Sequence, residues 1–205
     1  MRTTRPIAAM LIGYLLGTVP TADIVARRVS AGTVDLRTAG SGNPGGANAM
    51  AVLGSRAGTV VMAGDIGKGA LASAAGAVVA GRPGAHLAGT AAVIGHCYPV
   101  WNGFRGGKGV AASVGQCLAT FPAYFPIDLA IAAVTVSNTK WRHRAFAATA
   151  VSSVCWVLGG LVWWAKGWRN LWGPRPSLGL PLAAATSSAV ITHRFWSADR
   201  ARRNL

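Results

Sequence analysis

Apolar segments recur along almost the whole chain and alternate with short polar or glycine-rich stretches. They cover residues 7–26, 50–80, 85–98, 109–121, 125–139, 145–165 and 177–193. A helix needs about 20 apolar residues to cross a bilayer, so several of these segments are short for a full crossing. Such helices are tolerated where protein or water covers their backbone. The pattern predicts an all-α integral membrane protein with about seven transmembrane helices, several of them short, in a single polytopic domain over residues 1–205.

Composition indicates that the solvent of this chain is a bilayer. Lys and Arg number 20 against 5 Asp and Glu, giving a formal charge of +15, which in a soluble protein would suggest a nucleic-acid partner. However, only 12% of the residues are charged, whereas soluble domains carry about 25%. Hydrophobic residues make up 52% of the chain. We therefore expect membrane lipids as neighbours and no nucleic acid as a partner.

Seven crossings place the two termini on opposite faces, and the cations predict which face is cytoplasmic. With the N-terminus outside and the C-terminus inside, thirteen Lys and Arg lie on cytoplasmic loops and six on the outer face. Lys68 is left within the second segment. This distribution follows the positive-inside rule. It also brings the polar segments 35–48, 99–109 and 193–203 to the cytoplasmic face, where re-entrant-like glycine-rich loops are expected to form one site.

The first polar loop reads D-L-R-T-A-G-S-G-N-P-G-G-A-N over residues 35–48 and directly precedes a predicted helix. Such a loop offers backbone N–H groups and a helix N-terminus to an anion. Candidate binding residues here are Gly40, Gly42, Asn43 and Asn48. Ser41 is a candidate nucleophile, a hydrogen-bond donor to phosphate, or a turn residue. A glycine-rich turn between two membrane helices is the alternative interpretation of the whole loop.

The second loop reads G-H-C-Y-P-V-W-N-G-F-R-G-G-K-G-V over residues 95–110 and carries two cations among glycines. Compact glycines allow phosphate oxygens to reach the backbone while cations neutralise them. The loop is not a Walker A motif, because Asn102 replaces its first glycine and a glycine replaces its Ser/Thr. A positive-inside anchor loop would explain the cations but not the glycines. The candidate phosphate-binding residues are Arg105, Gly106, Gly107, Lys108 and Gly109.

Three further ionisable residues are candidates. Asp65 and Lys68 stand three residues apart in an apolar segment, where charged groups are costly unless they are paired or face water. They are either support for a site or a structural ion pair. His193 ends the last apolar segment and is either an acid, base or phosphate ligand, or an interfacial residue. The four histidines lack the spacing of metal ligands, so neither a metal nor another cofactor is expected.

Taken together, these stretches resemble the bacterial membrane acyltransferases that acylate glycerol 3-phosphate from acyl phosphate, the PlsY family. The likeness lies in the two loops, in G-D-I-G-K-G at 64–69, in G-Y-L-L-G at 13–17 and in the terminal H-R at 193–194. It implies seven helices in the bacterial inner (plasma) membrane and no metal. It also implies transfer of a fatty acyl group to the 1-hydroxyl of glycerol 3-phosphate, giving lysophosphatidic acid for phospholipid synthesis. Ser41 and His193 would be catalytic, and Lys108 with its glycines would bind phosphate.

The chain differs from the family pattern at several motif positions. Ala47 stands where the family has Thr, Ala51 where it has a phosphate-binding Arg, and Trp196 where it has Asn; Glu is absent altogether. Arg56 and Arg105 are candidates to replace the missing arginine. The differences leave three alternatives: a degenerate member acting as a membrane scaffold, a small transporter, and an enzyme acylating another phosphorylated acceptor.

Overall fold

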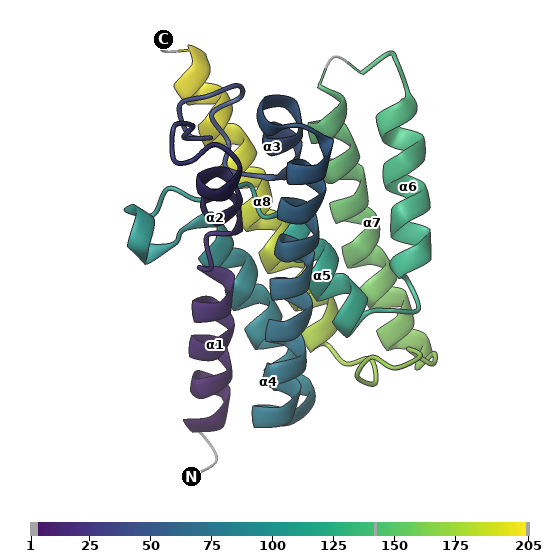
Figure 1. The fold of residues 1–205 in the computed structure, drawn as a ribbon. Coiled ribbons are helices and arrows are strands. Elements are labelled where there is room, and N and C mark those ends of the chain that lie inside the picture. Colours follow the sequence, from purple (N-terminus) through teal and green to yellow (C-terminus); the bar gives the residue numbers. More distant parts are fainter. Residues whose placement is uncertain (1–3, 142, 204–205) are drawn as a thin grey trace.

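The computed structural model describes residues 4–141 and 143–203, except for the side chains of residues 199 and 201–203. Within these residues the chain is helical and contains no strand (Figure 1). The helices are α1 (Thr4–Gly17), α2 (Thr21–Val29), α3 (Gly46–Leu53), α4 (Ser55–Cys97), the 3₁₀ helix η1 (Val100–Asn102), α5 (Val110–Thr120), α6 (Phe125–Ser137), α7 (Arg144–Lys166) and α8 (Gly179–Arg203).

Helix α4 consists of two helical halves joined by a reversal at Ala80 and Gly81. Gly81 has φ +64° and ψ −151°, which glycine adopts far more readily than other residues. The backbones of Gly76 and Gly84 are in direct contact across the reversal, so the two halves run antiparallel. The predicted division of this region into two apolar segments is therefore confirmed.

Two other segments that were predicted to be continuous are interrupted. The segment 7–26 divides into α1 and α2, because Pro20 lacks an N–H and restricts the backbone of Val19. The segment 50–80 is interrupted at Gly54, where φ is +93° between α3 and α4. The prediction of continuous helices was wrong at both places. Both interruptions lie next to the loops that form the candidate site.

Small residues allow α1 and α5 to pack closely against α4. Gly13 and Gly17 of α1 contact the backbones of Ala88 and Ala92 in the second half of α4. Both pairs have a spacing of four residues, which is the small-xxx-small arrangement of membrane helix pairs. On the other side, Gly69 of α4 lies against α5 in the same way. The α4 hairpin is therefore the central element of the bundle.

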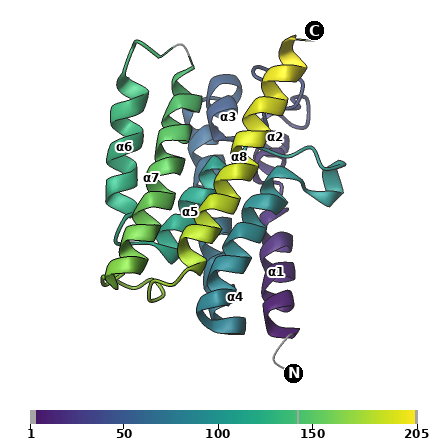
Figure 2. The ribbon, with the colours of Figure 1, turned by 180° about the vertical axis from the view of Figure 1, so that it is seen from behind.

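The two termini lie at opposite ends of the bundle (Figures 1 and 2). Loops 30–45 and 138–141 lie at the end that carries the C-terminus, and loop 167–178 lies at the N-terminal end. Helices α6 and α7 stand side by side, and α8 crosses the face seen in Figure 2. On length and composition alone, Thr4–Val29 and Arg144–Lys166 are the stretches able to cross a membrane among the described residues.

Candidate active site

A cavity of about 650 Å³ lies near the two glycine loops and is called here the large cavity. Its walls come mainly from α4, α5, α6 and α7, and most of the side chains along them are apolar. Its polar mouth is formed by residues of both glycine loops. The structure thus brings together six predicted site residues from distant parts of the sequence: Ser41, Asn43, Asn48, Asp65, Lys108 and Gly109.

The backbone that presents Ser41 is held by the buried side chain of Asn48. The Asn48 Oδ1 atom accepts a hydrogen bond of 2.7 Å from the Ser41 N–H, and Nδ2 donates bonds of 3.0 Å to the carbonyl oxygens of Leu36 and Ala39. Gly40 and Gly42 flank Ser41 with φ of +58° and +70°, in the left-handed region that favours glycine. Neither glycine lines the large cavity. Asn48 and the two glycines therefore shape the loop around Ser41.

The second glycine loop is fixed at Gly106 and Gly107, both of which are buried. Their N–H groups donate 3.1 Å hydrogen bonds to the carbonyl oxygens of Cys97 and His96. From α8, Arg194 donates to the Gly107 and Gly106 carbonyl oxygens at 3.1 and 2.7 Å. Sequence reasoning did not select Arg194 as a site residue. It positions the loop that carries Lys108.

Of the cations in and near these loops, Lys108 is the one that lines the large cavity. Its Nζ atom lies 4.2 Å from the centroid of the Phe195 ring, a cation–π distance that steadies the ammonium group. The side chains of Arg105 and Arg56 are exposed and line neither cavity described here. The backbone carbonyl of Arg105 accepts a 3.1 Å bond from Arg37 Nε. Arg105 therefore takes part through its backbone.

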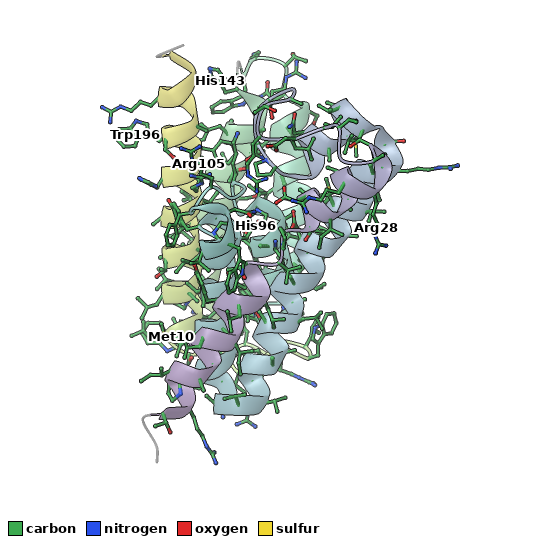
Figure 3. The ribbon with its side chains drawn as sticks, turned by 60° about the vertical axis from the view of Figure 1, so that its left-hand side comes forward. Met10, Arg28, His96, Arg105, His143 and Trp196 are labelled. Carbon is green, nitrogen blue, oxygen red and sulfur yellow. The ribbon has the colours of Figure 1, made fainter. Side chains whose placement is uncertain are left out.

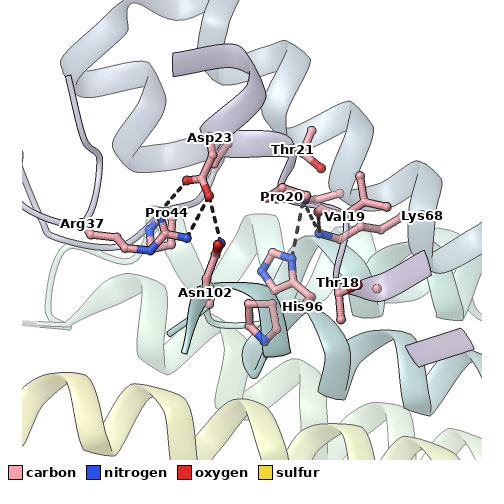
Figure 4. A pocket seen from close by; sticks show the side chains of 16 residues that line it. Thr18, Val19, Pro20, Thr21, Asp23, Arg37, Pro44, Lys68, His96 and Asn102 are labelled. Carbon is pink, nitrogen blue, oxygen red and sulfur yellow. Dashed lines mark hydrogen bonds and ion pairs between the residues drawn. The ribbon is translucent and has the colours of Figure 1, made fainter. Parts of the chain in front are cut away.

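A second space, the small cavity, lies beside the break between α1 and α2 and has a volume of about 20 Å³, enough for about one water molecule. Asp23 accepts hydrogen bonds from Arg37 at 2.6 and 3.0 Å and from Asn102 at 2.9 Å (Figure 4). This cluster joins α2, the first glycine loop and η1. The sequence analysis did not predict any of these three as a site residue. The signal available in the sequence was the opposite charge of Asp23 and Arg37 on either side of a short loop.

Asp65, Lys68 and His96 form a buried charged group in the wall between the two cavities. The Lys68 Nζ atom is 2.8 Å from Asp65 Oδ1, and His96 Nδ1 is 3.4 Å from the same oxygen. Lys68 also donates a 3.0 Å bond to the Val19 carbonyl, which the break after α1 exposes. Figure 3 shows His96 inside the bundle. Asp65 and His96 line both cavities, so this group of residues forms part of the wall that the two cavities share.

His193 lies on an exposed part of α8 and lines neither cavity. Its Nδ1 atom is 2.7 Å from the hydroxyl oxygen of Tyr98. Tyr98 directly follows α4 and lies outside the helices. Burial raises the pKa of its phenol, so the hydroxyl keeps its proton at neutral pH. A protonated phenol can donate to Nδ1 and leave Nε2 to carry the imidazole proton.

A sequence model described as glycerol-3-phosphate acyltransferase matches residues 7–198. The chain belongs to this family. The resemblance that the motifs carried is therefore confirmed, and the family is one of enzymes, as the sequence predicted.

Curated relatives from several bacteria carry the name glycerol-3-phosphate acyltransferase. The protein of Exiguobacterium sibiricum is 45% identical over 123 residues, which is 60% of this chain and 59% of the relative. That of Clostridioides difficile is 43% identical over 137 residues, or 64% and 66% of the two chains. That of Thermoanaerobacter pseudethanolicus is 38% identical over 154 residues, or 75% of each.

Two solved structures share the fold. Both are of PlsY, described as an integral membrane glycerol 3-phosphate acyltransferase. The glycerol 3-phosphate form superposes with a TM-score of 0.75 at 25% identity, covering 94% of this chain and 88% of that one. The lysophosphatidic acid form gives a TM-score of 0.75 at 24% identity, covering 97% and 92%. The chain is thus an all-helical integral membrane protein.

Proposed function

We propose that this chain transfers a fatty acyl group from acyl phosphate to the 1-hydroxyl of glycerol 3-phosphate and releases lysophosphatidic acid. The observation that carries the proposal is the large cavity, whose mouth holds Ser41 and Lys108 and whose body is apolar. A phosphate suits the cation and the N-terminus of α5 at the mouth, and an acyl chain suits the apolar walls. Acyl phosphate unites these two chemistries in one molecule.

The chemistry places definite demands on the residues at the mouth. The 1-hydroxyl oxygen attacks the acyl carbonyl carbon, an ester bond forms, and the bond from that carbon to the phosphate oxygen breaks. Phosphate leaves with the bonding electrons and the hydroxyl proton passes to a base. Lys108 stabilises the charge that develops on the leaving phosphate, and Ser41 donates a hydrogen bond to it. The resemblance assigns the acceptor's proton, or the orientation of the acceptor, to His193. Tyr98 holds its imidazole outside the two cavities, so the acceptor hydroxyl has to approach the α8 side of the mouth.

We place the site at the cytoplasmic face of the bacterial inner membrane. Seven crossings, made by α1, the two halves of α4, and α5 to α8, agree with termini at opposite ends of the bundle. The end with the C-terminus carries Arg27, Arg28, Lys140, Arg144 and Arg200, and the positive-inside rule assigns that end to the cytoplasm.

The purified full chain is tested with glycerol 3-phosphate and either octadecanoyl phosphate or octadecanoyl-CoA, and lysophosphatidic acid is measured. We expect product from acyl phosphate. Lys108→Ala is expected to lower kcat/KM about 10- to 100-fold, the range for losing a charged hydrogen bond. Arg105→Ala, which removes an exposed cation, is the matched control and is expected to change it less than about 3-fold. Absence of product from both donors contradicts the activity, whereas unchanged turnover in Lys108→Ala and Ser41→Ala contradicts the site.

A different phosphorylated acceptor is the second candidate, and one observation favours it. The resemblance places a phosphate-binding arginine at the position of Ala51, and neither Arg56 nor Arg105 lines a cavity in its place. Competition between glycerol 3-phosphate and other phosphorylated polyols in the same assay distinguishes the two. Preferential acylation of another polyol phosphate would support the second candidate.

A further inference from the structure

The large cavity carries a polar cluster far from its mouth. Asp128 of α6 and Ser152 and Trp156 of α7 line the same cavity as Ser41 and Lys108. Asp128 lies close to Cys117 of α5, which is nine residues beyond Lys108 in the sequence. The seven helical steps from Val110 to Cys117 along α5 correspond to roughly 10 Å. An acyl chain with its phosphate at Lys108 would therefore reach the cluster with its middle or far part.

The polar groups of this cluster are buried without matching partners. Among the described residues, Trp156 Nε1 is buried with no hydrogen-bond partner, and Asp128 Oδ1 and Ser152 Oγ are buried with none beyond the contact between these two side chains. Trp156 is only 6% exposed. Buried polar atoms in proteins are almost always paired, so an unpaired set facing a cavity indicates a ligand group that completes it. The indole N–H is a donor, the carboxylate an acceptor, and the serine hydroxyl both.

We infer that the cluster recognises a hydroxyl group partway along the acyl chain. A hydroxyl donates to a carboxyl oxygen of Asp128 and accepts from the Trp156 N–H at the same time, with Ser152 beside the carboxyl group. A plain chain of the same length leaves these groups unpaired. The substrate class is therefore a hydroxylated acyl phosphate, and this assignment rests on the proposed function, which places the acyl chain in the large cavity.

A competition experiment tests the inference. The purified full chain receives glycerol 3-phosphate and an equimolar pair of octadecanoyl phosphates, one unsubstituted and one with a hydroxyl near its middle, and mass spectrometry gives the product ratio. We expect about tenfold preference for the hydroxylated donor, since a site that pairs a substrate hydroxyl discriminates against the analogue lacking it. Asp128→Leu combined with Ser152→Ala is expected to abolish or reverse the preference. Trp156→Phe is expected to reduce it.

Thr149→Val is the matched control. Thr149 also lines the cavity on α7, but its hydroxyl donates to the Ala145 carbonyl at 2.8 Å. We expect this variant to keep the product ratio of the unmodified chain. Equal use of both donors by the unmodified chain, or a ratio that the Asp128 and Ser152 substitutions leave unchanged, overturns the inference.

A binding measurement separates this inference from the proposed function. Thermal stabilisation of the unmodified chain and the Asp128→Leu, Ser152→Ala variant is recorded with free octadecanoic acid and with its hydroxylated form. Greater stabilisation by the hydroxylated acid, lost in the variant, supports the cluster as a hydroxyl site even if neither donor yields product. That result would contradict the proposed function but not the hydroxyl site. Equal stabilisation by the two acids contradicts the cluster's role.

Discussion

At the scale of residues, several side chains of the candidate site act on the backbone of the loops. Asn48 holds the Ser41 loop through three hydrogen bonds, and Arg194 holds Gly106 and Gly107 through two. A loop fixed in this way keeps its N–H groups and cations in position before substrate arrives. That positioning lowers the entropy cost of bringing two phosphorylated substrates together.

Asn48→Ala is expected to lower both stability and activity. The substitution leaves the Ser41 N–H and two carbonyl oxygens without their bonds, at a cost on the order of 3 kcal/mol. Thermal unfolding in detergent measures the stability, and lysophosphatidic acid formation measures the activity. Asn43→Ala in the same loop is the control and is expected to leave the unfolding temperature nearly unchanged. A similar fall in unfolding temperature for Asn48→Ala and Asn43→Ala would contradict the role given to Asn48.

Ala51→Arg is expected to lower the KM for glycerol 3-phosphate several-fold with little change in kcat. Ala51 lies on α3 one helical turn after Ala47, which lines the large cavity, so a long side chain can reach its mouth. One added charged bond to phosphate corresponds to about 1.5–3 kcal/mol. Steady-state kinetics checks the effect, and Ala51→Gln controls for side-chain length. An unchanged KM would show that the acceptor phosphate binds elsewhere.

The sequence predicted the residues at the mouth because their loops carry glycines and cations in an unusual run. It did not predict Asp23, Arg37, His96 or Arg194. Each of these acts through a partner from another part of the chain, such as Arg194, which bonds a carbonyl 88 positions earlier. Pairings of that kind depend on how the helices pack, and no local pattern reports them. The roles of Ser41, Lys108 and His193 in catalysis stay predictions.

At the scale of elements, the apolar segments located the helices well and missed two of their interruptions. The predicted segments 109–121 and 145–165 agree closely with α5 and α7. Apolar residues continue through the breaks at Thr18–Pro20 and Gly54, so hydropathy alone does not reveal them. Single residues cause these breaks: a proline that ends hydrogen bonding and a glycine with positive φ. The small cavity lies at the first break, where the helix backbone is open to the site.

Gly13→Ala is expected to destabilise the fold by about 1–3 kcal/mol through overpacking, because a Cβ at this position meets the backbone of Ala88. Thermal unfolding of the purified protein measures the effect. Gly67→Ala on α4 is the matched control, since a Cβ there meets nothing within 4 Å. Alanine also favours helix over glycine, so the control is expected to be neutral or slightly stabilising. Equal unfolding temperatures for the two variants would contradict close packing between α1 and α4.

At the scale of the whole molecule, the excess of positive charge and the position of the site have a common explanation. Most of the Lys and Arg behind the formal charge of +15 fall, in the proposed topology, on the face that also carries the two glycine loops. Figure 1 shows loop 30–45 at the end of the bundle that carries the C-terminus. In the proposed orientation, cations at this end face the cytoplasm and anionic lipid head groups. One of them, Lys108, lies at the mouth of the large cavity. Charged substrates made in the cytoplasm would then meet the site on the same face.

Labelling of engineered cysteines is expected to establish this orientation. Thr139→Cys lies in the exposed loop between α6 and α7, and Leu178→Cys lies in the loop before α8, where Leu178 is 47% exposed. In intact spheroplasts, a membrane-impermeant maleimide should modify Leu178→Cys and spare Thr139→Cys until the membrane is permeabilised. The unmodified chain controls for its own thiols, of which Cys97 and Cys117 are buried. The opposite labelling pattern would place both glycine loops outside the cell, away from cytoplasmic glycerol 3-phosphate, and would contradict the proposed function.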